Sequence, residues 1–200
     1  MMELNTTEED HSKNLTYTIQ NIVVKTSLNL RENLNLNRIS KEIRNTEYNK
    51  ERFPGLFLRL RYPKCAIILF KNGKLILTGI KSFDHIALAI NRLILKFNEI
   101  YENTISRDSI HPYIVNIVIT ANFYKKINLD LAVIRLDNAI YEPEVFPGLI
   151  YHSSNPVKAA FLIFSTGQIV FTGVKEKRVI EPALINLRRL LYKKNLFITS

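Results

Sequence analysis

The chain carries the same pattern twice, and this internal repeat restricts its possible folds more than any other feature. Residues 47–81 align with residues 140–175, and Phe-Pro-Gly and Thr-Gly-x-Lys sequences occur in both stretches. Phe53 of the first copy recurs 93 positions later as Phe146. Two copies of about ninety residues favour one molecule with pseudo-twofold symmetry over a solenoid, which generally needs at least three repeats.

Each copy has the same order of apolar patterns: a strand, a helix, several strands and a closing helix. Helical spacing marks the helices, as Ile86 and Ile90 do near the end of the first copy. Pro182 fits the last helix only in its first turn, where the missing N–H is harmless. The first strands of the two copies surround Asn21 and Asn116. The predicted helices span 34–44 and 85–98 in the first copy, and 127–137 and 178–194 in the second.

Two glycine-containing turns separate apolar runs at the same place in each copy. Asn72-Gly73 and Thr166-Gly167 are typical of tight β-hairpins. The first is the stronger signal, because Asn and Gly both tolerate a positive φ and we place both at the centre of the turn.

The strands next to these turns are apolar on both faces. Two helices per copy can cover only one face of a sheet, so the second face is either packed against another sheet, as in a sandwich, or exposed. An exposed apolar face flanked by Lys and Arg is typical of a binding surface. In residues 64–70, one face holds Cys65, Ile67 and Leu69, and the other holds Ala66, Ile68 and Phe70.

Charge limits the partners of such a surface. The 28 Lys and Arg outnumber the 18 Asp and Glu, which gives a formal net charge of +10. This favours a polyanion, with nucleic acid first and an anionic membrane second. Four acidic side chains against Lys13 alone predict a disordered acidic arm at the N-terminus. The expected divisions are the arm at 1–16, a first repeat at 17–100, a linker at 101–112 and a second repeat at 113–200.

The sequence offers little material for catalysis or metal binding. The single cysteine, Cys65, excludes an internal disulfide and a cysteine-rich zinc site, and its strand position predicts a buried thiol. No glycine-rich phosphate loop and no paired-histidine spacing occurs, so we expect no cofactor. No apolar run reaches the roughly 20 residues that cross a bilayer. The scattered histidines are His11, His85, His111 and His152.

Over residues 17–197 the sequence resembles the core of TATA-box-binding proteins. The matching stretches are QNIV, EYN..RF, LFKNGKLILTGIK, YEPE.FPGLIY and LIFSTGQIVFTGVK, together with the repeat itself. The resemblance implies an α+β fold: a saddle with a continuous ten-stranded antiparallel sheet, helices on the convex side and DNA under the concave side. Members of this family bind the minor groove and kink the duplex with inserted apolar side chains.

The resemblance also implies which side chains meet the bases. Phenylalanine in a strand is usually core, but here two pairs recur symmetrically at the family's wedge positions. The A·T minor groove presents only acceptors, which suits side chains with donors. A strand asparagine could instead cap a β-bulge. The implied wedges are Phe53 with Phe70 and Phe146 with Phe164. The implied donors are Asn21, Asn116, Thr78 and Thr172. The implied apolar floor is Val23, Ile68, Ile76, Val118, Leu162 and Val170.

Phosphate contacts are implied around this floor, and they are uneven between the repeats. Such cations supply salt-dependent affinity without reading sequence, although each alone is typical of a solvated surface charge. His152 and Gln168 stand where the family has Arg and Lys. The implied phosphate-binding residues are Arg52, Arg59, Lys64, Lys74 and Lys81 in the first repeat, and Lys158 and Lys175 in the second.

Protein partners are implied as well. Glu142 and Glu144 match the acidic stirrup that contacts transcription factor IIB in the family, and a basic helical side would meet transcription factor IIA type proteins and other polymerase-associated factors. A plain solvated helix face explains the same cations equally well. The cations of the helical side are Arg92, Lys96, Arg188, Arg189, Lys193 and Lys194.

The resemblance therefore implies a non-enzymatic general transcription factor that recognises and bends the TATA element and nucleates preinitiation-complex assembly. Two alternatives are a DNA-repair glycosylase, which can include a similar saddle, and a paralogue that serves as a protein-interaction scaffold. A glycosylase would also need a helical catalytic domain. Archaeal members of the family tend to be acidic, so the positive charge predicts a eukaryotic source and a nuclear location.

Overall fold

The computed structural model describes residues 15–30, 32–101 and 105–198. The predicted acidic arm at 1–16 lies outside the described residues except for Leu15 and Thr16. Ten strands form one sheet in the order β2-β3-β4-β5-β1-β6-β10-β9-β8-β7, and the strand pairs are antiparallel. This confirms the predicted α+β class with a ten-stranded antiparallel sheet.

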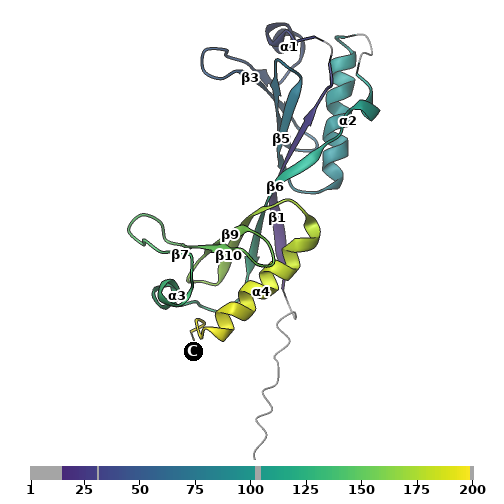
Figure 1. Ribbon diagram of the computed structural model, residues 1–200. Helices are drawn as coiled ribbons and strands as arrows, with labels where there is room; N and C mark the ends of the chain where they lie inside the picture. Colours follow the sequence, from purple (N-terminus) through teal and green to yellow (C-terminus); the bar gives the residue numbers. More distant parts are fainter. Residues whose placement is uncertain (1–14, 31, 102–104, 199–200) are drawn as a thin grey trace, which may run out of the picture. The chain divides into compact units, whose positions relative to one another are not determined.

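The chain divides into two compact units, residues 19–117 and residues 118–200 with the residues before Ile19 (Figure 1). The long strands β1 (Tyr17–Ser27) and β6 (Tyr113–Asn122) contribute to both. The other elements of the first unit are α1 (Leu36–Glu42), β2 (Thr46–Glu47), β3 (Gly55–Leu60), β4 (Cys65–Phe70), β5 (Lys74–Ile80), α2 (Asp84–Asn98) and η1 (Arg107–Ser109). Those of the second are α3 (Leu129–Arg135), β7 (Ala139–Ile140), β8 (Leu149–Ser153), β9 (Ala159–Ile163), β10 (Gln168–Val174), η2 (Lys177–Val179) and α4 (Ile180–Lys193).

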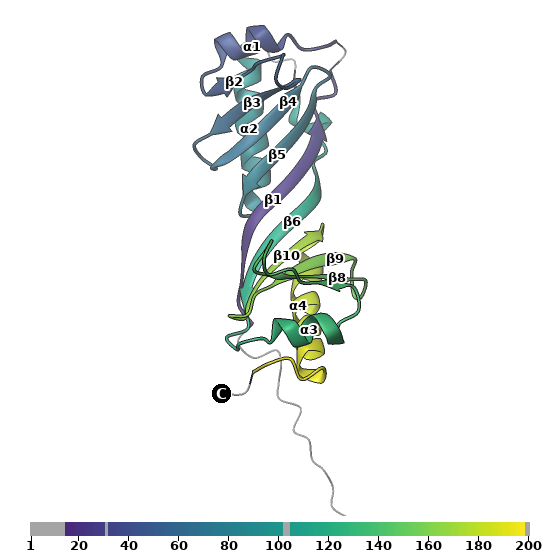
Figure 2. The same cartoon turned by 90° about the vertical axis from the view of Figure 1, so that its left-hand side faces the viewer.

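Each unit has its core on one face of its strands. In β4 the side chains alternate strictly between buried and half-buried positions, and β9 does the same. Figures 1 and 2 show α2 along one face of the first unit's strands and α4 along one face of the second unit's. Each helix buries a row of apolar side chains against the strands. Fully burying one large apolar side chain contributes about 1.5–3 kcal/mol, so these rows stabilise the packing of the helices on the sheet. They include Ile90, Leu93 and Phe97 of α2, and Leu184, Leu187 and Leu191 of α4.

The second face of the strands has no other sheet packed on it. Every named strand of the described residues belongs to the one sheet. The sandwich alternative is therefore wrong, and the half-buried face of each unit is open. We name it the uncovered face.

The predicted hairpin turns are in the right places, but their geometry differs from the prediction. Gly73 has a φ of 77° and Gly167 a φ of 89°, whereas Asn72 and Thr166 are not in the positive-φ region. The N–H of Gly73 donates to the carbonyl of Phe70 at 2.9 Å. The turn is thus centred one residue earlier, and the glycine follows it as the left-handed residue of a three-residue loop.

The short helices α1 and α3 are two residues shorter at each end than predicted. Each begins after an asparagine whose side-chain oxygen accepts a backbone N–H, Asn35 from Arg38 at 3.0 Å and Asn128 from Leu131 at 2.9 Å. Each asparagine thus starts its helix two residues after the predicted position. Ile43 and Leu136, which follow the two helices, have extended backbones, so the helices also end two residues early. α2 follows the prediction closely, and Pro182 occupies the first turn of α4 as expected.

Cys65 lies in the core of the first unit, as its strand position predicts. Its side chain is 6% exposed, and burial raises the pKa of the thiol to about 11. The thiol is therefore protonated at neutral pH and a poor nucleophile. Among the described helices, none is long and apolar enough to span a membrane.

Candidate nucleic-acid interface

The uncovered face of the first unit is built from rows of side chains that cross neighbouring strands. Cross-strand pairing places Phe57 opposite Ile68, Ile68 opposite Ile76, and Ile76 opposite Lys25. All but Lys25 are half-buried. In the second unit, Ile150, Leu162 and Val170 form the matching row. Four of the six predicted floor residues, Ile68, Ile76, Leu162 and Val170, therefore lie in two corresponding cross-strand rows. Val23 and Val118 are half-buried in β1 and β6.

The four predicted wedge residues form two ring pairs. The ring centroids of Phe53 and Phe70 lie 6.0 Å apart, and those of Phe146 and Phe164 lie 5.8 Å apart. Phe53 is 36% exposed, and the other three rings are half-buried. Each pair is thus preassembled at the surface of its unit. The first pair has a third ring that the sequence did not single out, because Phe57 lies 5.3 Å from Phe53.

A glycine beneath each wedge makes room for its ring. A Cβ added to Gly55 would lie 2.7 Å from Cε1 of Phe53, and one added to Gly148 would lie 2.7 Å from Cε1 of Phe146. Real Cβ contacts are essentially never this short. The glycine of the Phe-Pro-Gly sequence therefore lets the ring lie flat against the strand.

Asn21 has a structural role in addition to its predicted one. Its Oδ1 accepts the backbone N–H of Gly79 at 2.7 Å, and its Nδ2 donates to Oγ1 of Thr78 at 3.2 Å. The pairing of β1 with β5 shifts register between Ile22 and Val24, directly after Asn21. The alternative that this asparagine caps a bulge is thus correct for Asn21. The Gly79 bond also fixes the amide so that its NH₂ group points toward Thr78.

The other predicted donors occupy corresponding positions. Thr78 pairs with Ala66, and Thr172 pairs with Ala160, so each threonine lies beside an alanine on a neighbouring strand. Small neighbours leave both threonine side chains accessible. Asn116 is half-buried in β6.

The predicted phosphate-binding cations are all exposed, and they contact few other groups. Arg59 forms a 3.4 Å ion pair with Glu47, and Nζ of Lys81 lies 3.4 Å from Oε1 of Gln20. An exposed pair of this kind contributes at most about 1 kcal/mol, so Arg59 can exchange Glu47 for another anion. The exposed set is Arg52, Arg59, Lys64, Lys74, Lys81, Lys158 and Lys175.

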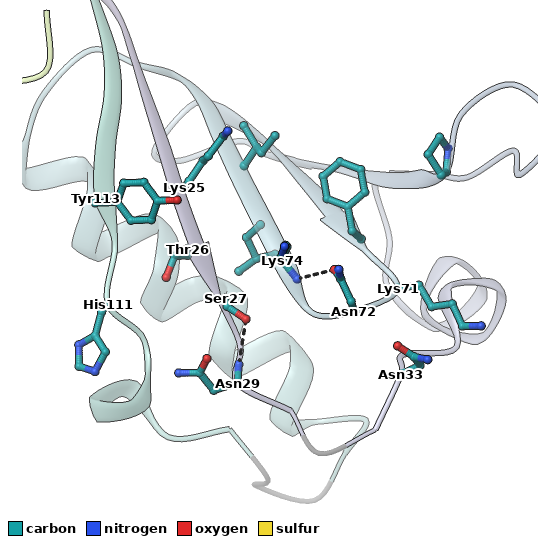
Figure 3. A pocket seen from close by; sticks show the side chains of 14 residues that line it. Lys25, Thr26, Ser27, Asn29, Asn33, Lys71, Asn72, Lys74, His111 and Tyr113 are labelled. Atoms are coloured by element: carbon teal, nitrogen blue, oxygen red, sulfur yellow. Dashed lines mark hydrogen bonds between the residues drawn. The ribbon is translucent and has the colours of Figure 1, made fainter.

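Two of the hollows on the first unit lie beside the predicted site residues. One, of about 430 Å³, is lined by Phe53, Phe57, Glu47, Arg52 and Arg59 among other residues. The other, of about 750 Å³, is shown in Figure 3 and contains Lys25 and Lys71 in its lining. We name the second one the lysine hollow. Sequence reasoning missed both of these lysines. The signal for Lys25 was its spacing of two from Val23, which puts the two on one face of a strand.

The stirrup of the second unit presents its acidic residues to solvent. Glu142 and Glu144 are exposed, and the carbonyl of Glu142 accepts the N–H groups of Val145 and Phe146, each at 2.9 Å. Val145, which lies between Glu144 and Phe146 in the chain, is 80% exposed.

Two of the helical cations lie over aromatic rings. Arg92 lies 5.4 Å from the centroid of the Tyr62 ring, and Arg188 lies 6.0 Å from that of the Phe123 ring. No group of three metal-ligating side chains was found among the described residues.

Known proteins share both the sequence pattern and the fold. The family model "Transcription factor TFIID (or TATA-binding protein, TBP)" matches residues 16–100 and 111–194. The TATA-box-binding protein of Sulfurisphaera tokodaii is 40% identical over 83% of this chain and 81% of its own length. That of Picrophilus torridus is 40% identical over 90% of this chain and 96% of its own. The structure of Methanococcus jannaschii TBP matches with a TM-score of 0.77 and 34% identity, over 88% of this chain and 98% of that one.

Proposed function

The chain belongs to the family of TATA-box-binding proteins, and from this membership we propose that it reads A·T-rich promoter DNA with the uncovered faces of its repeats. It is a TATA-binding general transcription factor and not an enzyme. Neither the glycosylase nor the scaffold alternative has support from the relatives.

One observation carries the proposed mode of binding: both units present an apolar cross-strand row next to a pair of phenylalanine rings. The minor groove of A·T pairs has no exocyclic amino group, whereas guanine places an N2 amino group there. An apolar floor offers that amino group no acceptor. The rows therefore favour A·T pairs by leaving a G·C pair with an unsatisfied donor.

The phenylalanine pairs would open the base steps at the two ends of the contacted element. Unstacking a step costs a few kcal/mol and must be offset by apolar contact. Phe53 and Phe146 suit this role, because each ring lies over a glycine and contacts the other ring of its pair at the surface, and Phe53 contacts Phe57 as well. No core packing has to be broken to insert them.

Asn21, Asn116, Thr78 and Thr172 supply the donors in this proposal. For Asn21 the direction is set by the Gly79 N–H, which occupies the amide oxygen. Its NH₂ group is then the part that can reach adenine N3 or thymine O2, both of which are acceptors. Phosphate contacts come from the exposed cations named above, which add affinity without reading sequence.

Protein partners follow the same logic of charge. Glu142 and Glu144 are exposed on a tight turn and suit a basic surface, as a transcription factor IIB type protein would present. The cations of α2 and α4 suit acidic surfaces of transcription factor IIA type proteins or other polymerase-associated factors. We also retain the division into repeats at 17–100 and 113–200 with a linker between them. A nuclear location remains a prediction from charge alone, and the relatives named above are archaeal.

Competition binding tests the proposal directly. The full chain is titrated against a labelled TATA duplex in the presence of unlabelled duplexes in which single A·T pairs are replaced by G·C. We expect each central replacement to weaken competition by about 1–3 kcal/mol, and fluorescence transfer between the duplex ends to rise on binding. Equal competition by all duplexes would overturn the proposed function.

A further inference from the structure

The lysine hollow gathers cations from three neighbouring segments of the first unit (Figure 3). Lys25 comes from β1, Lys74 from β5, and Lys71 from the loop between β4 and β5. No carboxylate is among the described residues that line it. None of the three ammonium groups forms an ion pair within the described part of the chain. The hollow is therefore a concentration of uncompensated positive charge.

One neutral side chain beside the lysines is suited to an oxyanion. Asn72 uses its side-chain oxygen to accept the N–H of Lys74 at 3.2 Å, so its NH₂ group is the part that can donate to an anionic oxygen. Thr26 also lines the hollow, but its hydroxyl belongs to the buried face of β1 and does not reach that oxygen.

The position of the hollow indicates which anion it meets. Phe70 of the first wedge pair and Pro54, which follows Phe53 in the chain, belong to its wall. Lys25 ends the apolar row of Phe57, Ile68 and Ile76. A duplex whose base step is opened by Phe53 and Phe70 must continue past this wall. Its backbone carries one charge per about 1.7 Å of helix axis, so several phosphates pass the three lysines.

The second unit lacks these charges at the matching positions. Its smaller hollow, of about 300 Å³, is lined by Thr120, Ala121 and Gln168 in place of Lys25, Thr26 and Lys74. Ser165 replaces Lys71. Of the two units, only the first has the cationic hollow.

We propose that Lys25 and Lys71 join Lys74 in binding the phosphates of the flanking duplex just outside the wedge step of the first repeat. The protein then holds flanking DNA at one end only. This inference rests on the proposed function. It adds two contact residues and a contacted DNA segment that lie outside the A·T element. Lysine suits this role, because a compact charge on a flexible stem needs no fixed geometry at the phosphate.

The test exchanges residues between repeats. The full chain with Lys25→Thr and Lys71→Ser receives side chains that already occupy the matching positions of the second unit, so we expect it to fold. Affinity is measured against salt on two duplexes with the same TATA element, one with long flanks and one ending at the wedge steps. On the flanked duplex we expect the slope of log affinity against log salt to flatten by about two units. On the short duplex we expect no change.

The control variant removes the same two charges from the helical side, with Lys41→Ser and Lys193→Thr. We expect it to keep the wild-type slope on both duplexes. The reciprocal variant, Thr120→Lys with Ser165→Lys, should steepen the slope on the flanked duplex. Thermal unfolding of each variant verifies that it is folded.

Three results would overturn the inference. An unchanged slope on the flanked duplex would show that the two lysines do not meet phosphates. Equal flattening on both duplexes would place their contacts inside the element. Stabilisation of the free wild-type protein by inorganic phosphate, absent from the double variant, together with an unchanged slope, would assign the hollow to a small anion. Failure of the wild type to prefer A·T pairs is a separate result, since it concerns only the proposed function.

Discussion

The two repeats share a backbone plan but differ in the charge of the surface that it presents. Residues 17–100 hold 15 basic and 6 acidic side chains, and residues 113–200 hold 11 and 6. The additional basic side chains of the first repeat lie at exposed positions of strands and turns, outside the core. The exchanged pairs are Lys25 and Thr120, Arg52 and Val145, Arg59 and His152, Lys71 and Ser165, and Lys74 and Gln168.

On the proposed mode of binding, this difference means that the two repeats contact a duplex in different ways. The first unit surrounds its wedge with cations and a three-ring cluster, since Phe57 packs against Phe53. The second unit surrounds its wedge with apolar groups: Ile150 replaces Phe57, and Val145 and Ile140 are 80% and 51% exposed. We expect the first end to depend strongly on salt and the second to depend mainly on apolar contact.

The largest effect should come from removing a wedge pair. Replacing Phe146 and Phe164 together with Ala removes the apolar insertion that offsets unstacking, so we expect binding to weaken by about 2–4 kcal/mol and the bend to decrease. Fluorescence transfer across the duplex measures the bend. The matched variant replaces Phe53 and Phe70. Because Phe57 remains beside that wedge, we expect the smaller loss there. A wild-type bend in either double variant would contradict the wedge assignment for that end.

A smaller effect should come from Asn21, where the structural and reading roles can be separated. Asn21→Ala removes the hydrogen bond to the exposed Gly79 N–H, so we expect about 0.5–1.5 kcal/mol less stability and a loss of A·T preference. Asn21→Asp keeps the acceptor and removes the donor. We expect it to remain stable and to shift preference toward G·C, because a carboxylate can accept from the guanine amino group. Urea unfolding and competition binding measure the two effects, and full A·T preference in both variants would refute the reading role.

Single cations at matching positions should change the salt dependence by about one unit. Lys74→Ala should flatten the slope of log affinity against log salt by about 0.9, whereas Gln168→Ala should leave it unchanged. Gln168→Lys should steepen it. All three are measured on one TATA duplex at fixed pH. Equal slopes for Lys74→Ala and Gln168→Ala would mean that the charge difference between the repeats has no consequence for binding.

The smallest effect should come from Glu47, whose counterpart is Ile140. Glu47→Ile removes a carboxylate beside the proposed path of the backbone and releases Arg59 from its 3.4 Å ion pair. We expect stability to change by less than about 1 kcal/mol and DNA binding to tighten by a few fold at low salt. Calorimetry and the same titration measure both. Weaker binding would show that Glu47 orients Arg59 productively.

Much of the fold could be predicted from the sequence, because the repeat shows which patterns belong together. The apolar alternation of 64–70 gave the two faces of β4, and the recurrence of Phe53 and Phe70 separated surface rings from core rings. What was missed depends on local geometry. Asn35 and Asn128 are N-caps that start α1 and α3 two residues later than predicted, because apolar periodicity does not resolve single positions at a helix boundary.

The missed parts of the site have a different cause. Lys25 belongs to the proposed interface because β1 pairs with β5 in a register that puts it opposite Ile76, and the register between strands distant in sequence cannot be derived from one chain. The acceptor of Asn21 is occupied by a backbone group 58 positions away. Both facts belong to the pairing of strands and not to either strand alone.

The unequal surroundings of the two wedges imply an order of events when the complex comes apart. Counterions compete with lysine contacts but hardly with apolar ones. As ionic strength rises, the end that holds Lys25, Lys71 and Lys74 should loosen first, while Phe146 and Phe164 remain inserted. At low ionic strength the order of release should reverse, so that the duplex straightens first at the second repeat. The surrounding salt would then decide from which side a promoter is released.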